Sequence, residues 1–355
     1  MLPKKPSMKR RMETQDYTER SIYMVTMATE GRRPLFGVVT GRPGAPVGST
    51  DAPRVVLTAL GRRVEEAGRL IPQFYPLVKV LALQVMPDHV HLVLFVQERM
   101  EVPLGRVVNG FKVGCNRAWK ELGGGKSGAL PQSGALPQCG KERDRRQDPR
   151  QDWRQDQDQN QRQDPKRDRA HGLLFETGYH DRVLKGRGQL QRMIDYVYDN
   201  PRRLLLKRAS PEYFRQTEVV VAGRRLHAFG NPELLKRKRK KAVKCSRSLS
   251  PEAIAAYRDE CLAEAREGKV LVSPFISPGE KAVEKAALGS GIAIIKFLDN
   301  GFPPFYKPAG EYFEACATGC LLLLTPYEYR TEHRVISRAV CLELNELTAA
   351  CVWLV

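Results

Sequence analysis

The sequence predicts an α+β fold, in which an antiparallel sheet with helices packed on it is followed by a small α/β domain. Three observations support this expectation. Short β-forming runs alternate with amphipathic helical patterns through the first two thirds of the chain. In the last third, continuous apolar strand segments alternate with helices, which is typical of a parallel sheet. A chain of 355 residues is also long enough for two domains, each with its own core.

Hydrophobic spacing places the elements of the first region. Runs of β-formers predict strands over residues 21–27, 77–86 and 90–96. Apolar positions three and four residues apart predict helices over residues 53–67, 103–122 and 189–200. Pro201 is expected to end the third helix, because proline lacks the backbone N–H that a helix interior requires. Two short strands are expected to add an edge hairpin to this domain, over residues 219–222 and 225–229.

The last region begins with Ser250-Pro251-Glu252, which combines an N-cap residue, a proline at the first helical position and an early acid. Helices are predicted over residues 251–268, 280–288, 311–317 and 337–351. Strands are predicted over residues 270–273, 291–297 and 321–324.

Composition indicates where the domains begin and end. A basic tail (1–16) precedes the first domain (17–235), and a basic linker (236–250) containing KRKRKK leads to the second domain (251–355). The segment 123–169 is a low-complexity insert with SGALPQ twice and a tract rich in Arg, Gln and Asp. It has almost no apolar residues to offset the entropy of ordering, so we expect a disordered loop.

The excess positive charge predicts a polyanionic partner. The chain has 59 Lys and Arg against 40 Asp and Glu, which gives a net charge of +19 and a pI near 9.7. Residues 1–249 carry 49 basic and 26 acidic side chains, whereas residues 250–355 carry 10 and 14. We therefore expect nucleic acid to bind the first domain.

Other features exclude a membrane protein and argue against a secreted one. No apolar run approaches ~18 residues, and the basic start is followed by neither an apolar region nor a small-residue cleavage site. The eight cysteines are scattered, with no CxxC pair, which indicates reduced cytoplasmic thiols.

The sharpest local motif is MPDHVHLVLFV, which contains His89 and His91. In a strand these two side chains project from the same face, about 7 Å apart along the chain, and can share one metal ion. An isolated pair of this kind is also compatible with hydrogen-bonded core imidazoles.

The helix LQRMIDYVYDN carries a second pair of polar residues. At about 100° per residue, Tyr196 and Asn200 lie about 40° apart on one flank of the apolar stripe. A phenol can act as a nucleophile, and an amide oxygen can complete a metal site beside two imidazoles. Alternatively, Tyr196 is a core residue and Asn200 is simply the last residue before Pro201.

Three ordered motifs resemble the single-tyrosine HUH transposases of bacterial insertion sequences, in particular the REP-associated tyrosine transposases. The motifs are MPDHVHLV from Met86, GYHDRVL from Gly178 and YVYDNPRR from Tyr196. The likeness covers residues 17–231 apart from the insert. It implies a ferredoxin-like (RRM-like) domain in which His89 and His91 are metal ligands, Tyr196 is the nucleophile and Asn200 is the remaining ligand.

The sequence departs from the family pattern at three places. Asp88 stands where the family often has Asn or Glu, Arg202 replaces the usual Val, and the long insert is additional. None of these changes removes a catalytic group. The insert is the change that would alter a dimer interface or the path of DNA.

The resemblance implies a metal-dependent enzyme that cleaves and rejoins single-stranded, hairpin-bearing DNA through a 5′-phosphotyrosine intermediate, with no need for ATP. Mg²⁺ or Mn²⁺ is the expected cofactor. A phenol with a pKa near 10 needs activation, for which Arg182 and Lys185 are candidate cations. A homodimer and a cytoplasmic, nucleoid-associated location accompany this expectation.

Phosphate contacts are expected from basic side chains in several segments, which give affinity but no base readout. These residues are Lys4, Lys5, Arg10, Arg11, Arg62, Arg63, Arg182, Lys185, Arg202 and Arg203. The KRKRKK run is equally compatible with a DNA contact and with a solvated charge run.

Two other functions remain open at this point. The first is a domesticated, catalytically silent regulator that binds hairpin DNA. The second, a zinc hydrolase, is disfavoured because no third His, Cys or carboxylate stands at ligand spacing.

The segment VSPFISPGEKAVEKAALGSGIAIIK resembles the DprA-like and lysine-decarboxylase-like group, which implies a Rossmann-like second domain. The chain lacks the GxGxxG fingerprint, so nucleotide binding has no support there. The acidic balance of residues 250–355 is equally compatible with a structural or protein-interaction module and with a ligand site.

Overall fold

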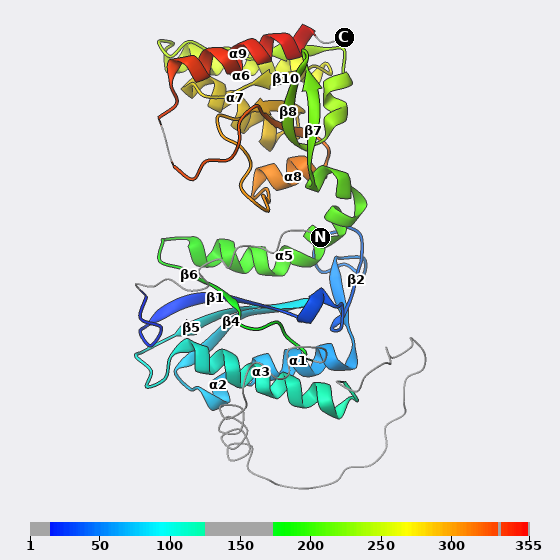
Figure 1. Cartoon of the computed structure of the whole chain (residues 1–355), viewed down its shortest axis with the longest axis vertical. Helices are drawn as coiled ribbons and strands as arrows, with labels where there is room; N and C mark the ends of the chain where they lie inside the picture. Colours follow the sequence, from blue (N-terminus) through cyan, green and yellow to red (C-terminus); the bar gives the residue numbers. More distant parts are fainter. Residues whose placement is uncertain (1–14, 125–172, 333–334, 354–355) are drawn as a thin grey trace. The chain divides into compact units, whose positions relative to one another are not determined.

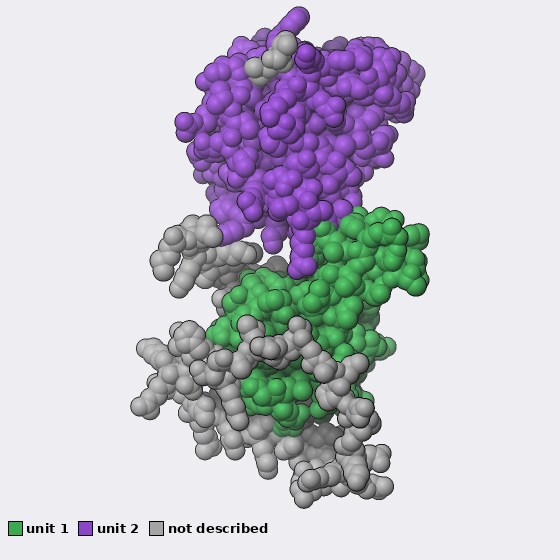
Figure 2. Space-filling view, turned by 90° about the vertical axis from the view of Figure 1, so that its right-hand side faces the viewer, with its two compact units in different colours: residues 1–205 green, residues 206–355 purple. Residues whose placement is uncertain are grey.

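The computed structural model describes residues 15–124, 173–332 and 335–353. The chain divides into two compact units, of which the first ends at Leu205 and the second begins at Leu206 (Figure 2). The first unit is built on an antiparallel sheet and the second on a mixed sheet, each with helices (Figure 1). The predicted α+β class is therefore confirmed. The expected disordered insert lies outside the described residues apart from its first two, and the basic tail apart from its last two.

The sheet of the first unit has four strands in the order β4-β5-β1-β6, and every neighbouring pair is antiparallel. These strands are β1 (Ser21–Ala28), β4 (Val78–Met86), β5 (His89–Val96) and β6 (His180–Val183). The helices are η1 (Glu30–Arg32), α1 (Ala59–Arg69), α2 (Ile71–Phe74), α3 (Leu104–Glu121) and α5 (Gln189–Ala209). A separate two-stranded sheet pairs β2 (Gly37–Thr40) with β3 (Arg54–Leu57).

Alternation of side chains along the strands gives this sheet two covered faces. Tyr23 and Val25 of β1 face different sides from Met24, because successive side chains in a strand point in opposite directions. The face of Tyr23 and Val25 is buried in the core that includes α1 and α3. Met24 instead packs with Val93 of β5 and Val197 of α5, and α5 covers this side of the sheet (Figure 1). The side of the sheet that α5 covers therefore carries Val93 and every second residue of β5 counted from it.

One predicted helix of the first unit begins later than expected. Residues 53–67 were expected to be one helix, but Arg54–Leu57 forms strand β3 and α1 starts at Ala59. The β-branched pair Val55 and Val56 favours a strand. The hydroxyl of Thr58 then accepts a hydrogen bond from the Gly61 amide at 3.0 Å, which caps the helix.

Helix α5 is longer than predicted, because it continues through Pro201 to Ala209. The expectation that Pro201 ends the helix is therefore wrong. Pro201 removes the donor that would bond to the carbonyl of Val197, four residues earlier. The side-chain amide of Asn200 donates to that carbonyl at 3.3 Å and to the carbonyl of Tyr196 at 2.7 Å. The side chain thus replaces the donor that proline lacks.

The sheet of the second unit has six strands in the order β7-β8-β12-β11-β10-β9. Strands β9 to β12 are parallel, whereas β8 is antiparallel to β12 and β7 to β8. The strands are β7 (Gln216–Val221), β8 (Arg224–Gly230), β9 (Lys240–Ala242), β10 (Val270–Ser273), β11 (Ile294–Phe297) and β12 (Leu321–Thr325). The helices are η2 (Pro211–Phe214), η3 (Pro232–Lys236), α6 (Pro251–Arg266), α7 (Pro278–Gly289), α8 (Glu311–Ala317) and α9 (Arg338–Trp353).

The elements predicted from residue 250 onward are all present, with ends that differ by a few residues. Helices α6, α7 and α8 bury their apolar residues in one core and α9 in another. The parallel strands contribute alternate residues to the two cores, as in Leu271 and Val272 of β10. The prediction of a parallel sheet between helices is therefore confirmed for this part of the chain.

The border between the units lies earlier than composition suggested. The β7–β8 hairpin, expected in the first domain, pairs with β12 and buries Leu226 and Ala228 in the second core. The expected linker over residues 236–250 contains β9, an edge strand of the same sheet. Apolar burial rather than charge selects a strand's partner, so composition missed this border. From Leu206 onward the chain carries 23 basic and 17 acidic side chains, so the second unit is basic rather than acidic.

Three side chains of the KRKRKK run form ion pairs within the second unit. Lys236 contacts Glu233 at 2.8 Å and Arg239 contacts Glu267 at 3.5 Å. Lys241 forms an ion pair with Glu264 of α6, which also holds Lys269. These contacts fix β9 at the sheet edge and account for part of the positive charge without nucleic acid.

The two lysine ammonium groups that contact Glu264 are expected to make the stability of the fold depend on pH. Hydrogen bonds from Lys241 and Lys269 lower the pKa of Glu264 from 4.5 to about 2. Between those values the unfolded chain binds the proton and the folded chain does not, so unfolding becomes easier as pH falls. The stability advantage of the wild type over Glu264→Gln is expected to be complete above pH 4.5 and absent near pH 2.

Thermal unfolding of the full chain between pH 2 and 7 measures this difference. Glu260→Gln is the matched control, because Glu260 holds only Lys241 and its side chain is 60% exposed. A Glu264→Gln variant whose deficit does not change with pH would contradict the prediction.

Candidate functional site

The two histidines of the HxH motif face one another at the start of β5. His91 is 5% exposed, and its Nε2 lies 3.1 Å from the Nε2 of His89. The ring centroids are 4.6 Å apart and the ring planes are nearly perpendicular, at 84°. The expectation that both side chains project from one face is therefore confirmed.

The remaining nitrogen of each ring has a polar partner. His89 Nδ1 lies 2.6 Å from Oδ1 of Asp88, and His91 Nδ1 lies 2.8 Å from the hydroxyl of Thr26. Burial raises the pKa of Asp88, but the hydrogen bond to His89 and the charges of His89 and Arg32 outweigh it and leave the pKa below its ordinary value. Partners of this kind orient imidazoles that bind metals.

Thr26 takes its place in the site through strand pairing. It lies directly opposite His91 in the β1–β5 register, so both side chains emerge on the same face of the sheet. This contact could not be predicted from the sequence pattern, because the two residues lie 65 positions apart. Only the register of the two strands reveals Thr26.

Tyr196 comes to this site from α5, which covers the same face of the sheet. Its ring centroid is 6.0 Å from that of His91, with an angle of 65° between the planes. The side chain is 39% exposed, so a substrate has access to the phenol. The structure therefore brings together His89, His91 and Tyr196, as the sequence predicts.

Asn200 lies one turn after Tyr196 and is 9% exposed. Its side-chain nitrogen is the atom that donates to the carbonyls of Tyr196 and Val197. These bonds fix the plane of the amide and commit its nitrogen to the helix. A metal would therefore meet the amide through its oxygen, which is the ligand atom that the sequence predicts.

The cation next to Tyr196 is Arg203, rather than Arg182 or Lys185. Arg203 lies seven residues further along α5 and places its guanidinium 5.4 Å from the centre of the Tyr196 ring. Arg182 lies on β6 opposite Met24, and Lys185 is exposed just after that strand. The structure gives no contact between either of these two residues and the phenol.

The other predicted DNA-binding residues have varied surroundings. Arg202 forms a two-pronged contact with Asp199, at 2.6 and 3.1 Å. Arg62 donates to the Leu57 carbonyl, and Arg63 pairs with Glu66 and Glu121. Four predicted residues lie outside the described part of the chain, namely Lys4, Lys5, Arg10 and Arg11.

A change at Arg203 tests the role of the stacked cation. Arg203→Ala is expected to slow reaction at Tyr196 about two- to fivefold, since a partly exposed cation–π contact contributes about 0.5–1 kcal/mol. Initial rates of DNA-adduct formation measure this effect. Arg202→Ala, which removes an arginine paired with Asp199, is the matched control and should change the rate less.

The donor set fits a divalent metal ion. Two imidazole nitrogens 3.1 Å apart, with their second nitrogens already bonded, can act as a pair of ligands, and the amide oxygen of Asn200 is the hard donor that the sequence predicts beside them. Over the described ranges, neither this site nor any other contains a cluster of three or more His, Cys, Asp or Glu side chains that could hold a metal. His89, His91 and Asn200 are therefore the residues that would hold the ion.

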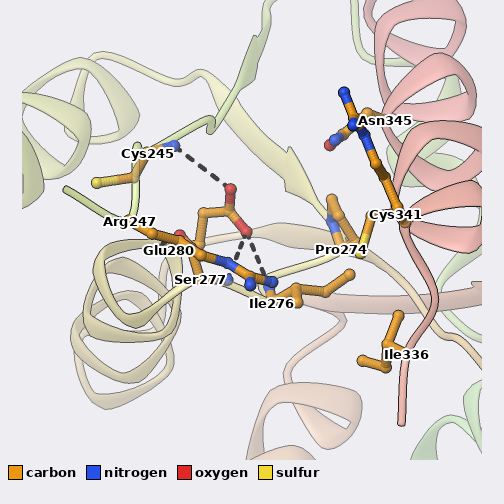
Figure 3. Close-up of a pocket in the computed structure, with 10 residues that line it drawn as sticks. Cys245, Arg247, Pro274, Ile276, Ser277, Glu280, Ile336, Cys341 and Asn345 are labelled. Carbon is orange, nitrogen blue, oxygen red and sulfur yellow. Dashed lines mark hydrogen bonds between the residues drawn. The ribbon is translucent and has the colours of Figure 1, made fainter.

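The second unit contains a cavity of about 440 Å³ where α7 begins (Figure 3). The carboxylate of Glu280 points into this region and accepts hydrogen bonds from the backbone amides of Cys245, Ile276 and Ser277, at 3.3, 2.8 and 3.1 Å. The amino end of a helix favours an anion. Here the chain supplies that anion itself, as the Glu280 carboxylate of the capping box at the start of α7.

The seven described cysteines are free. Burial raises the pKa of Cys316 to about 12, as expected for a packed side chain. Among the described helices, none combines the length and apolar character needed to cross a bilayer.

Comparisons with known proteins give remote resemblances of fold. No family model matches the chain, and no curated protein matches it. A REP-associated tyrosine transposase bound to a REP hairpin is 12% identical, over 54% of this chain and 72% of that chain, with a TM-score of 0.30. DNA processing protein A from Helicobacter pylori is 17% identical, over 39% and 67%, with a TM-score of 0.31. The same protein from Streptococcus pneumoniae is 22% identical, over 44% and 59%, with a TM-score of 0.31.

Proposed function

We propose that the protein is a metal-dependent DNA transesterase that cleaves and rejoins single-stranded DNA bearing a hairpin, with Tyr196 as the nucleophile. The observation that supports this most is the position of the solvent-accessible Tyr196 ring. Its centroid lies 6.0 Å from that of His91, whose Nε2 is in contact with the Nε2 of His89. The three ordered sequence motifs supply the substrate class. The proposed activity is that of an HUH transposase.

In the proposed reaction, the Tyr196 hydroxyl oxygen attacks the scissile phosphorus in line with the leaving 3′ oxygen. The bond from phosphorus to that 3′ oxygen breaks as the bond to tyrosine forms. The phenol loses its proton and the leaving oxygen gains one, so protons balance. The products are a 5′-phosphotyrosyl protein and a free 3′-OH, which preserves the energy of the phosphodiester for rejoining.

Each residue of the site has its own role in this proposed reaction. His89, His91 and Asn200 would hold Mg²⁺ or Mn²⁺, which when bound supplies Lewis-acid stabilisation of the charge that develops on the phosphate. Asp88 orients His89 through the 2.6 Å contact. Arg203 places a positive charge over the face of the Tyr196 ring.

The charge of the first unit supports a nucleic acid partner. Residues 1–205 carry 36 Lys and Arg against 23 Asp and Glu. Arg182 of β6 and Lys185, just after that strand, are exposed cations, and Arg182 lies opposite Met24 of β1 on the sheet face that carries the histidines. We propose that they contact backbone phosphates, together with the basic tail. A homodimer and a nucleoid-associated, cytoplasmic location belong to the same proposal.

End-labelled DNA tests this function. Single-stranded oligonucleotides that carry hairpins from DNA flanking the gene are incubated with the protein and Mn²⁺, then separated under denaturing conditions. A label at the 3′ end is expected to stay on the protein, whereas a label at the 5′ end is released on a fragment that a polymerase can extend. Chelation of the metal is expected to abolish both products.

Three results would contradict the proposal. A 5′ label retained on the protein would indicate the opposite polarity. Cleavage without an adduct would indicate hydrolysis. Hairpin binding without cleavage would favour a silent DNA-binding regulator instead.

A further inference from the structure

A surface of unpaired cations lies where strand β6 leads into helix α5. Residues 182–194 contain four basic and no acidic side chains. All four are exposed, and within the described part of the chain none of them has a side-chain hydrogen bond, an ion pair or a ring contact. These residues are Arg182, Lys185, Arg187 and Arg192.

Arginines elsewhere in the first unit are often held by acids of the same unit. Arg69 pairs with Glu65 at 3.2 Å, and Arg99 pairs with Asp16 at 3.1 Å. On α5 itself, Arg202 is paired with Asp199. The charge at the start of α5 is therefore not neutralised by the protein, so it is available to a ligand.

The connection that carries Lys185 and Arg187 is fastened to the first turn of α5. The side-chain oxygen of Gln189 accepts a hydrogen bond from the Gly186 amide at 3.0 Å, and the Gln189 amide donates to the Gly186 carbonyl at 3.1 Å. Gly188 makes the bend with a φ of 73°, which glycine adopts without strain. The two cations are thus held in place before a ligand binds, which lowers the entropic cost of binding.

This cationic surface begins one helical turn from the proposed nucleophile. Arg192 precedes Tyr196 by four residues, so the two side chains are neighbours on one flank of α5. The acid between them in the sequence, Asp195, accepts a hydrogen bond from Gln191 at 2.7 Å. At the other end of the surface, Arg182 lies on the sheet face that α5 covers. The cations therefore extend from Tyr196 to β6.

The arrangement suits an extended polyanion. The four cations lie on three successive elements, so a ligand with several spaced negative charges can meet them in turn. The amino end of α5 adds the positive end of a helix dipole. A DNA strand carries one negative charge per phosphate, and in the proposed reaction one of those phosphates lies at Tyr196.

We propose that Arg187 and Arg192 join Arg182 and Lys185 in holding the phosphates that flank the scissile one, all on one side of it. This inference rests on the proposed function, because the same strand would react with Tyr196. Arg182 and Lys185 are predicted from the sequence, whereas the structure adds Arg187 and Arg192. Together they set the direction in which the single strand leaves the site.

Two double variants of the full chain test this surface. Arg187→Gln with Arg192→Gln removes two charges and keeps much of the length of each side chain. Lys79→Gln with Lys120→Gln is the matched control, because these lysines are also exposed and without a side-chain partner in the described structure, but lie on β4 and at the end of α3. Both double variants lose the same net charge. Circular dichroism spectra and melting temperatures verify that each one is folded.

The salt dependence of DNA binding is the first measurement. Affinity for a single-stranded oligonucleotide with a hairpin is measured by fluorescence anisotropy at several salt concentrations, with a chelator present to prevent cleavage. Each phosphate contact to a single strand contributes about 0.7 to the slope of log affinity against log salt concentration. The arginine double variant is therefore expected to reduce this slope by about 1.4, and the lysine control to leave it nearly unchanged.

Uncharged methylphosphonate linkages locate the contacts. Each oligonucleotide carries one such linkage, at a different position near the cleavage site. Linkages on one side of the scissile phosphate are expected to weaken binding to the wild type. The same linkages should not weaken binding to the arginine double variant, because the cations that met those phosphates are gone.

The outcomes separate this inference from the proposed function. A slope and a methylphosphonate profile that are the same in the arginine double variant and the wild type overturn the role of Arg187 and Arg192, while adduct formation by the wild type would still support the proposed function. Methylphosphonate effects that the arginines control on both sides of the scissile phosphate overturn the proposed direction of the strand. A wild type that binds the DNA but forms no adduct in Mn²⁺ overturns the proposed function.

Discussion

Replacement of His91 by alanine is expected to slow DNA cleavage roughly 10³-fold, because it removes one of the two imidazoles that we propose as ligands of the catalytic ion. His91 is 5% exposed and contacts His89, Thr26 and the ring of Tyr196, so it lies at the centre of the site. Cleavage rates with saturating DNA in Mn²⁺ measure the effect. The double variant with His89→Ala should lose little more, because the two residues act as one unit.

His227→Ala is the matched control for this prediction. His227 lies on β8 in the second unit, where it contacts Glu328 at 3.2 Å. Its replacement should leave the cleavage rate unchanged. A His91→Ala variant that stays folded and retains more than about a tenth of the rate would show that the ion, if it is needed, is held elsewhere.

Asn200→Ala is expected to have a double effect, on stability and on cleavage. The amide donates two hydrogen bonds to the carbonyls of Tyr196 and Val197, and each such bond contributes about 1 kcal/mol. Loss of both should lower the free energy of unfolding by about 1–3 kcal/mol. Loss of the amide oxygen should also weaken Mn²⁺ binding, if Asn200 is a ligand as proposed.

A second substitution separates the two effects. Pro201→Ala restores the backbone N–H that bonds to the Val197 carbonyl and removes a proline from a helix interior. The double variant Asn200→Ala with Pro201→Ala should therefore regain the stability of the wild type, but not its cleavage rate. Pro201→Ala alone should be at least as stable as the wild type and active. If the double variant regained both stability and activity, Asn200 would be a helix-stabilising residue and not a ligand.

The parts of the fold set by local patterns were predictable. His89 and His91 share a face because strand side chains alternate, and Ser250 caps its helix through a hydrogen bond to the amide of Ala253. The strands and helices after residue 250 follow from apolar runs and caps. These features depend on neighbours in the sequence, so one sequence is sufficient to reveal them.

The parts that depend on distant partners were not predictable. Thr26 joins the site through its register with His91, and Arg203 reaches Tyr196 only because α5 continues past Pro201. Proline normally stops a helix, but the Asn200 side chain supplies the missing donor. The β7–β8 hairpin likewise joined the second sheet because its apolar face is buried there.

We propose that Tyr196 itself forms the covalent bond to DNA. Adduct formation by tyrosine variants is a direct test of this bond. Tyr196→Phe keeps the ring beside His91 but removes the nucleophilic oxygen. Tyr198→Phe is the matched control, because Tyr198 lies on the same helix, is 54% exposed and borders the edge strand β4. Each protein is incubated with Mn²⁺ and hairpin-bearing single-stranded DNA and analysed by denaturing gel electrophoresis. We expect Tyr198→Phe to form the adduct like the wild type and Tyr196→Phe to form none. An adduct of undiminished yield with Tyr196→Phe would contradict it.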